Sequence, residues 1–225
     1  MNETTKTTEK TAKGFDFLTL ALLAFGGLGM EALYAYWFEP IIYGANMREW
    51  SLVQTLCHWV LTIITWGIFA ALLCRHSQSR YGFDLFAEHE PMRTWQWLGA
   101  AVCVGLALVV SYMDWEGFKI VKEYHSNGAL KFVFQYVYYF FETALFTLII
   151  IFGQKAFETW FKVKNIPYGG MICAVTWGIG HIFTKGSLWV GLLSALSGFA
   201  YGVVYLLLGR DIKKTYLALA VMFIL

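Results

Sequence analysis

The sequence has few charged residues, few prolines and no paired cysteines. Only 14% of its 225 residues are charged and three are prolines, whereas 58% are hydrophobic and 19% aromatic. This composition argues against an ordinary soluble domain and indicates a membrane protein, whose first partner is the lipid bilayer. The net charge is +2, and the basic residues do not cluster as a nucleic-acid surface would require. We therefore expect no nucleic-acid partner.

The four cysteines show no Cys-x-x-Cys spacing. Cys57, Cys74, Cys103 and Cys173 all lie in or at the ends of apolar runs, which favours reduced packing residues over a disulfide framework or a zinc site. A cleavable signal peptide is not expected either, because the apolar run behind the polar residues 1–14 is too long for one. Residues 1–14 are rich in Thr and Lys, and we predict that they form a flexible polar tail.

Long apolar runs dominate the rest of the chain. A helix needs about 20 mostly apolar residues to cross a bilayer. We therefore predict an all-α, polytopic transmembrane helix bundle that forms a single domain over residues 15–225. About seven spans are expected, although the last is short, at residues 15–38, 51–74, 94–113, 131–152, 169–184, 187–208 and 215–225.

The basic residues predict the orientation of the bundle. With the N-terminus inside, the outer segments hold five of the 17 basic residues, and the inner segments hold Lys6, Lys10, Lys13, Arg75, Arg80, Arg93, Lys155, Lys162, Lys164, Arg210, Lys213 and Lys214. The positive-inside rule therefore places the N-terminus in the cytoplasm. We expect a multi-pass protein of a plasma membrane, and a bacterial one.

One glutamate, Glu142, lies at the midpoint of the apolar run 131–152. A carboxylate there costs about 2.5–3.5 kcal/mol on insertion scales, so it must face protein or water. Gln135, Tyr138 and Tyr139 share its helix face. This polar stripe indicates a functional site. A protonated glutamate that only joins two helices through a hydrogen bond would give the same pattern.

His181 is the second candidate. Trp177 lies four residues earlier on the same helix face, and Gly178 and Gly180 leave one side bare for the close approach of a partner helix. A histidine in such a helix is either a satisfied packing residue or a functional group.

Three further features lie inside predicted spans. Gly198 and Gly202 have the GxxxG spacing of a helix contact, and Tyr201 lies between them. Glu31 and His58 are ionisable residues within apolar runs, and each could be structural or functional.

Glu142 and His181 together could form a water-activating site. A buried carboxylate can take a proton from water and return it later, and an imidazole can polarise a carbonyl or help to hold a metal. One Glu and one His fall short of the three protein ligands of catalytic zinc, so we assign no cofactor. The binding of a divalent metal is left as an open alternative. The residues expected to line a substrate site are Tyr138, Tyr139, Trp177 and Tyr201.

These residues resemble the motifs of the CPBP family of intramembrane proteases, which includes type II CAAX prenyl endopeptidases and bacteriocin self-immunity proteins. The resemblance covers about residues 130–225. That family carries Glu-Glu-x-x-x-Arg, then Phe-x-x-x-His, then His-x-x-x-Asn or Asp. Here Phe141-Glu142 occupies the first pair and Trp177-x-x-x-His181 resembles the second motif. The run GLLSALSGFAYGVVYLLLGRDI resembles the helix and turn before the third.

The chain departs from these motifs at several positions. One of the two glutamates is absent, Phe146 or Thr147 holds the arginine position, and Leu219 and Phe223 stand where the third motif has its His and its Asn or Asp. The resemblance implies an intramembrane endopeptidase that cleaves a membrane-associated peptide with water activated by Glu142 and with help from His181. The departures leave open a catalytically inactive relative that acts as an immunity, regulatory or ligand-binding membrane protein.

A third interpretation is an electron carrier with His58 and His181 as the axial ligands of a b-type haem, which needs both side chains at similar depth on facing helices. A retinal pigment is disfavoured, because the last span has no interior lysine for a Schiff base.

Overall fold

The computed structural model describes residues 12–87 and 91–225, so most of the predicted tail, residues 1–11, lies outside the described part. All the secondary structure in these ranges is helical, which confirms the all-α prediction. The elements are α1 (Gly14–Leu33), η1 (Tyr34–Phe38), α2 (Glu39–Tyr43), η2 (Met47–Glu49), α3 (Leu52–Tyr81), α4 (Thr94–Asp114), α5 (Lys119–Phe161), α6 (Tyr168–Cys173), η3 (Ala174–Gly178), α7 (Ile179–Lys185), α8 (Leu188–Leu207) and α9 (Ile212–Ile224).

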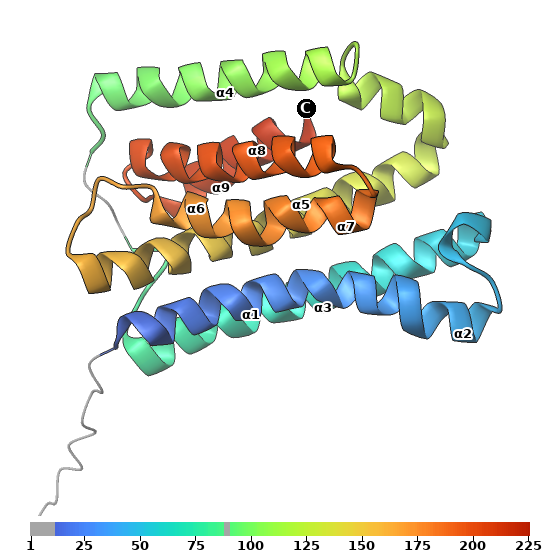
Figure 1. Cartoon of the computed structure of the whole chain (residues 1–225), viewed down its shortest axis with the longest axis horizontal. Coiled ribbons are helices and arrows are strands. Elements are labelled where there is room, and N and C mark those ends of the chain that lie inside the picture. Colours follow the sequence, from blue (N-terminus) through green and yellow to red (C-terminus); the bar gives the residue numbers. More distant parts are fainter. Residues whose placement is uncertain (1–11, 88–90) are drawn as a thin grey trace, which may run out of the picture.

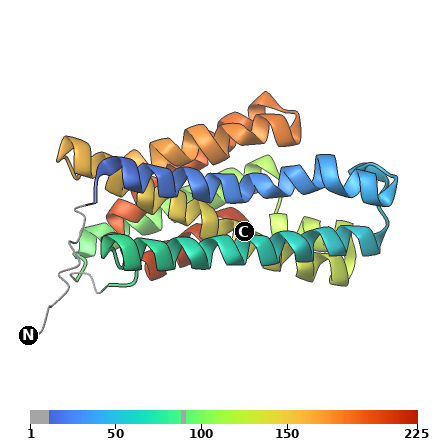
Figure 2. The same ribbon diagram turned by 90° about the horizontal axis from the view of Figure 1, so that it is seen from below.

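The long helices run side by side in a bundle with α5 at its centre (Figures 1 and 2). α5 packs against α1 and α3 on one side and against α6 and α9 on the other. α4 lies along the far edge and contacts α8 and α9. Seven consecutive residues of α5, from Leu145 to Ile151, are all buried, as expected for the central helix of a bundle.

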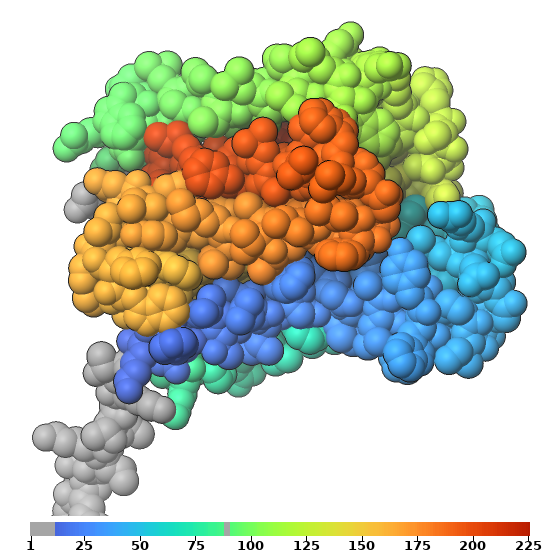
Figure 3. All heavy atoms as spheres, in the orientation of Figure 1, coloured from blue at the N-terminus to red at the C-terminus, as the bar shows by residue number. Residues whose placement is uncertain are grey.

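Five helical stretches are long and apolar enough to cross a membrane, namely 14–43, 52–81, 94–114, 119–161 and 188–207. The other two predicted spans are helical as well but shorter. Residues 168–185 combine α6, η3 and α7, and α9 has 13 residues. The outer face of α8, seen between α4 and the α6–α7 segment in Figure 3, exposes Leu188, Trp189, Leu192 and Leu196. Exposed apolar faces of this kind fit contact with lipid.

Two π-helical turns interrupt the bundle helices. η1 precedes Pro40, which has no N–H to donate to the preceding turn, so the helix widens there. η3 includes Trp177 and separates α6 from α7. Turns of this type occur frequently at functional sites, and η3 lies in the segment of the second predicted motif.

Glycines set the contact between α8 and the segment of α6 and η3, as the small-residue pattern predicts. A Cβ added at Gly178 would lie 2.5 Å from the Cα of Ala195, and one added at Gly170 would lie 2.9 Å from the Cα of Gly202. No side chain fits at these distances. Gly180 behaves differently, because only a Phe25 ring atom at 3.9 Å comes near it.

α5 contains a sharp break at Gly128, where φ is 70° and ψ is 166°. This conformation is accessible to glycine and to almost no other residue. The segment 119–127 therefore folds back on the rest of α5, so that Glu123 reaches Tyr139 and Asn127 reaches Gln135.

Candidate functional site

Glu142 is buried at the centre of the bundle and is held by Trp177. The indole Nε1 of Trp177 donates a hydrogen bond of 2.8 Å to Oε1 of Glu142. The glutamate is 8% exposed and the tryptophan 5%. The contact joins α5 to η3 and supplies the protein partner that a carboxylate at this depth requires.

His181 lies against the other side of Trp177. Its ring centroid is 4.6 Å from that of the indole, at an interplanar angle of 69°. Its Nδ1 is 2.8 Å from the backbone carbonyl oxygen of Trp177. A carbonyl can only accept, so the proton is on Nδ1, and Nε2 of the neutral ring is left as an acceptor. Trp177 thus brings the two predicted residues to one place.

Aromatic rings surround Trp177 on its remaining sides. Phe146, Tyr201 and Phe223 have centroids 4.9, 5.9 and 5.6 Å from the indole, and Phe146 stacks on Tyr201 at 5.2 Å. The resemblance described above leaves the arginine position to Phe146 or Thr147 and puts Leu219 and Phe223 at the positions of the third motif. Leu219 is fully buried. Phe223 brings an apolar ring from α9 to the site.

The other two predicted substrate residues lie at the edges of this cluster. Tyr138 points to α3, where its ring lies 4.6 Å from Trp66. Tyr139 contacts Phe223 at 5.2 Å and donates a 2.7 Å hydrogen bond to Glu123. Of the four tyrosine and tryptophan residues predicted to line the site, Trp177 and Tyr201 therefore form its wall, and Tyr139 connects to it through Phe223.

Lys119 and Glu123 were not predicted as site residues. Nζ of Lys119 donates to the carbonyl oxygen of Phe223 at 2.8 Å and lies 4.6 Å from the centroid of Tyr139. Glu123 also accepts hydrogen bonds from Gln135 and Tyr136. Their i, i+4 spacing is the sequence pattern that could have identified them, because it puts both side chains on one face of a helix.

A second buried cluster lies between α1, α2 and α3. Nδ1 of His58 is 2.6 Å from Oε2 of Glu39, and its Nε2 is 3.8 Å from Oε1 of Glu31. Both ring nitrogens of His58 face carboxylates, so this histidine is not open to haem iron and the haem interpretation gains no support. Within the described ranges, no three His, Cys, Asp or Glu residues are grouped as a metal site.

Lys119 connects to the site through Phe223, whose carbonyl oxygen accepts its hydrogen bond and whose ring packs on Trp177. Glu31 is one-third exposed, and Lys185, four residues after His181 at the end of α7, is exposed. The site is therefore a buried carboxylate and an imidazole on a tryptophan, walled by rings and bordered by charges of both signs.

The fold and this site define a helical membrane protein with buried ionisable groups inside its bundle. No protein-family model matches the chain, and no curated protein or solved structure matches it either. All four cysteines are free thiols, and Cys173 is buried beside η3.

Proposed function

We propose that the chain is a multi-pass protein of a bacterial plasma membrane, with about seven membrane segments and a cytoplasmic N-terminus. Five helices of spanning length support this proposal. The two shorter helical segments, 168–185 and 212–224, would complete the bundle within the membrane. The excess of basic residues in the segments on the N-terminal side supports the orientation.

We infer that the site around Glu142 and Trp177 binds a membrane-associated peptide without cleaving it, as expected for a catalytically inactive relative of the CPBP proteases. The observation that carries this inference is the packing of Phe146 and Phe223 against Trp177, where a protease of that type would have polar groups. A carboxylate beside aromatic rings suits an apolar peptide with a basic side chain, since the ring faces attract cations.

The test is a binding measurement on the full chain in nanodiscs. A panel of apolar peptides is titrated, half with one Lys or Arg and half with Gln in its place. We expect the basic peptides to bind to the wild-type chain. Glu142→Gln should weaken their binding about tenfold or more, because a hydrogen-bonded charge contributes about 1.5–3 kcal/mol. Glu49→Gln, at the exposed end of η2, is the control. Equal binding by the two glutamine variants would overturn the proposal.

Proteolysis is the second candidate, and one observation favours it. Glu142 and His181 both contact Trp177, so a base and a carbonyl-polarising group share one location. In that case the same peptides would be cut by the wild-type chain and left intact by Glu142→Gln.

A further inference from the structure

A separate cavity lies at the other end of α5. It has a volume of about 100 Å³ and lies between α5, the turn after α3 and the end of α8. Space for a water molecule takes about 10–15 Å³ on this measure, so the cavity has room for a group of several heavy atoms. Glu158 on its wall is about 24 Å from Glu142 along α5. Polar lining residues are Asp84, Gln154, Lys155, Glu158, Tyr205 and Arg210.

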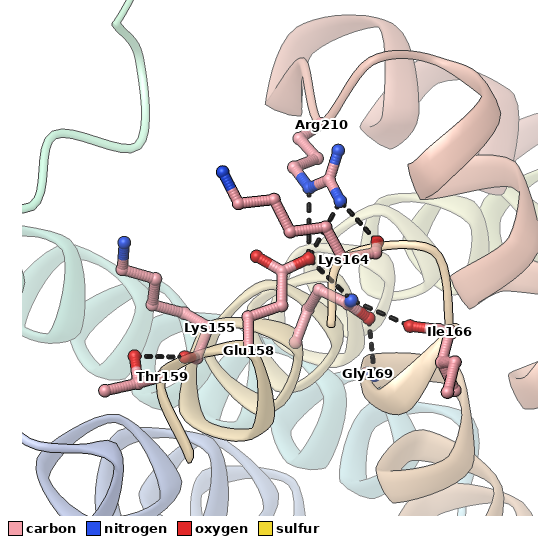
Figure 4. A network of polar contacts seen from close by, with 8 residues as sticks. Lys155, Glu158, Thr159, Lys164, Ile166, Gly169 and Arg210 are labelled. Carbon is pink, nitrogen blue, oxygen red and sulfur yellow. Dashed lines mark hydrogen bonds and ion pairs between the residues drawn. The ribbon is translucent and has the colours of Figure 1, made fainter. Parts of the chain in front are cut away.

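Part of the lining is a closed hydrogen-bond network, shown in Figure 4. Arg210 donates from Nη2 to Glu158 Oε1 at 2.8 Å and to the Lys164 carbonyl oxygen at 2.6 Å. Gln154 donates to the same Glu158 oxygen at 2.8 Å and to the carbonyl of Ile166 at 2.9 Å. Arg210 has a left-handed φ of 65°. Glu158 is therefore neutralised and its neighbours are fixed in place.

Two lining groups have no such partner. Lys155 forms no ion pair with any described residue, and its ammonium lies over the rings of Phe83 and Phe17, at 5.3 and 5.8 Å. Tyr205 is 4% exposed, and its hydroxyl makes no side-chain hydrogen bond within the described part of the chain. This hydroxyl is not among the fully buried polar atoms that lack a partner, and it is open to the cavity that Tyr205 lines. A ligand in the cavity would supply a polar partner for both groups.

The cavity wall carries two carboxylates and two cations, and Lys155 is the cation among them that is in no ion pair with a described residue. Asp84 lies on the exposed rim, where it caps the N–H of Phe86. In Figure 4 the Arg210 guanidinium lies above the Glu158 carboxylate, and the Lys155 ammonium points away from that pair, to the left. With Glu158 and Arg210 paired, Lys155 is the cation left on the cavity wall, and Asp84 is the carboxylate at its exposed rim.

Aromatic residues beside the cavity indicate that it would lie at the level of the phospholipid head groups. Trp160 and Phe157 occupy the same turns of α5 and pack on each other at 5.0 Å. Aromatic side chains gather at membrane interfaces, and this is the end of the bundle that holds most of the basic residues. Basic pockets between membrane helices on the cytoplasmic side recognise anionic head groups.

We propose that this cavity binds a phosphate group, carried by a phospholipid head group or free in solution, through the Lys155 ammonium and the Tyr205 hydroxyl. Arg210 and Glu158 shape the cavity from one side. The site is separate from the one around Glu142, so its test does not depend on the function proposed there.

The experiment measures the unfolding temperature of the full chain in a neutral, phosphate-free detergent. Three additions are compared: phosphatidic acid, diacylglycerol with the same acyl chains, and inorganic phosphate. We expect phosphatidic acid to raise the unfolding temperature and diacylglycerol to leave it unchanged. If inorganic phosphate also raises the unfolding temperature, the phosphate group alone is sufficient for binding. If only phosphatidic acid raises it, the lipid is the ligand.

Variants assign the effect to the cavity. Lys155→Met should weaken the binding of phosphatidic acid at least tenfold. Lys213→Met, which removes an exposed charge at the same end of the bundle, should leave this binding unchanged. Tyr205→Phe should weaken binding several-fold without destabilising the ligand-free protein, because its hydroxyl has no protein partner to lose. The proposal is wrong if diacylglycerol acts like phosphatidic acid, if no phosphate compound acts, or if Lys155→Met binds like the wild type.

Discussion

The indole N–H of Trp177 is the one polar group that pairs with the buried carboxylate of Glu142 among the described residues. Trp177→Phe would keep an aromatic ring beside Phe146 and Phe223, and it would remove this donor together with the pyrrole part of the buried indole. We expect the free energy of unfolding to fall by at least about 1.5–3 kcal/mol, because the lost hydrogen bond and the cavity left in the core both destabilise the fold. Denaturant titration in micelles measures the change.

Trp189→Phe is the matched control, because Trp189 is 64% exposed on α8. It should change the free energy of unfolding by less than about 0.5 kcal/mol. Equal losses in the two variants would show that the indole of Trp177 does not hold Glu142.

Helix packing at the scale of single elements depends on the bare backbone of Gly178. A methyl group there would lie 2.5 Å from the Cα of Ala195, so Gly178→Ala must push η3 away from α8. Overpacking of this kind costs about 1–3 kcal/mol. Thermal unfolding measures the loss, and binding at the Trp177 site should weaken with it.

Gly105→Ala in α4 is the control for this change, because no atom lies within 4 Å of an added Cβ there. The same substitution should then stabilise α4 by about 0.5–1 kcal/mol through backbone entropy. If both variants gained stability, α8 would not be in contact with η3.

The fold-back of α5 depends on Gly128. Gly128→Ala would place a side chain in a backbone region that only glycine occupies readily, at about 1–3 kcal/mol. We expect the segment 119–127 to detach first, since the hydrogen bonds of Lys119, Glu123 and Asn127 to the rest of the chain form only while the break at Gly128 folds the segment back. Faster amide hydrogen exchange in Gly128→Ala, confined to residues 119–127, would show this detachment. Unchanged exchange there would contradict the role of Gly128.

At the scale of the whole molecule, the orientation can be measured in intact cells. In a cysteine-free background, Asn46→Cys lies in the loop after α2 and Ser79→Cys in the last turn of α3. Both positions are exposed. We expect a membrane-impermeant maleimide to label Cys at 46 and not at 79 until the cells are opened. The reverse pattern would invert the proposed orientation.

The sequence allowed the all-helical fold to be predicted, and it singled out Glu142 and His181, which both contact Trp177 in the structure. Both residues interrupt apolar helices, and an ionisable group there must face the bundle interior. Glycine spacing likewise predicted the close approach of α8, which the structure confirms at Gly178 and Gly202.

The burial of Glu39, Lys119 and Glu123 could not be predicted in this way. These residues lie at or beyond the ends of apolar runs, where a charged side chain normally reaches water. They are buried because of two backbone features, the π turn before Pro40 and the break at Gly128. Such distortions depend on tertiary packing, and no periodic sequence pattern predicts them.

The most direct test of the account is mass spectrometry of an apolar, lysine-containing peptide after prolonged incubation with proteoliposomes of the wild-type chain. The account predicts that the peptide is recovered at its intact mass and is retained on wild-type vesicles more than on Glu142→Gln vesicles. Peptide fragments that form with the wild type and are missing with Glu142→Gln would contradict it and establish proteolysis.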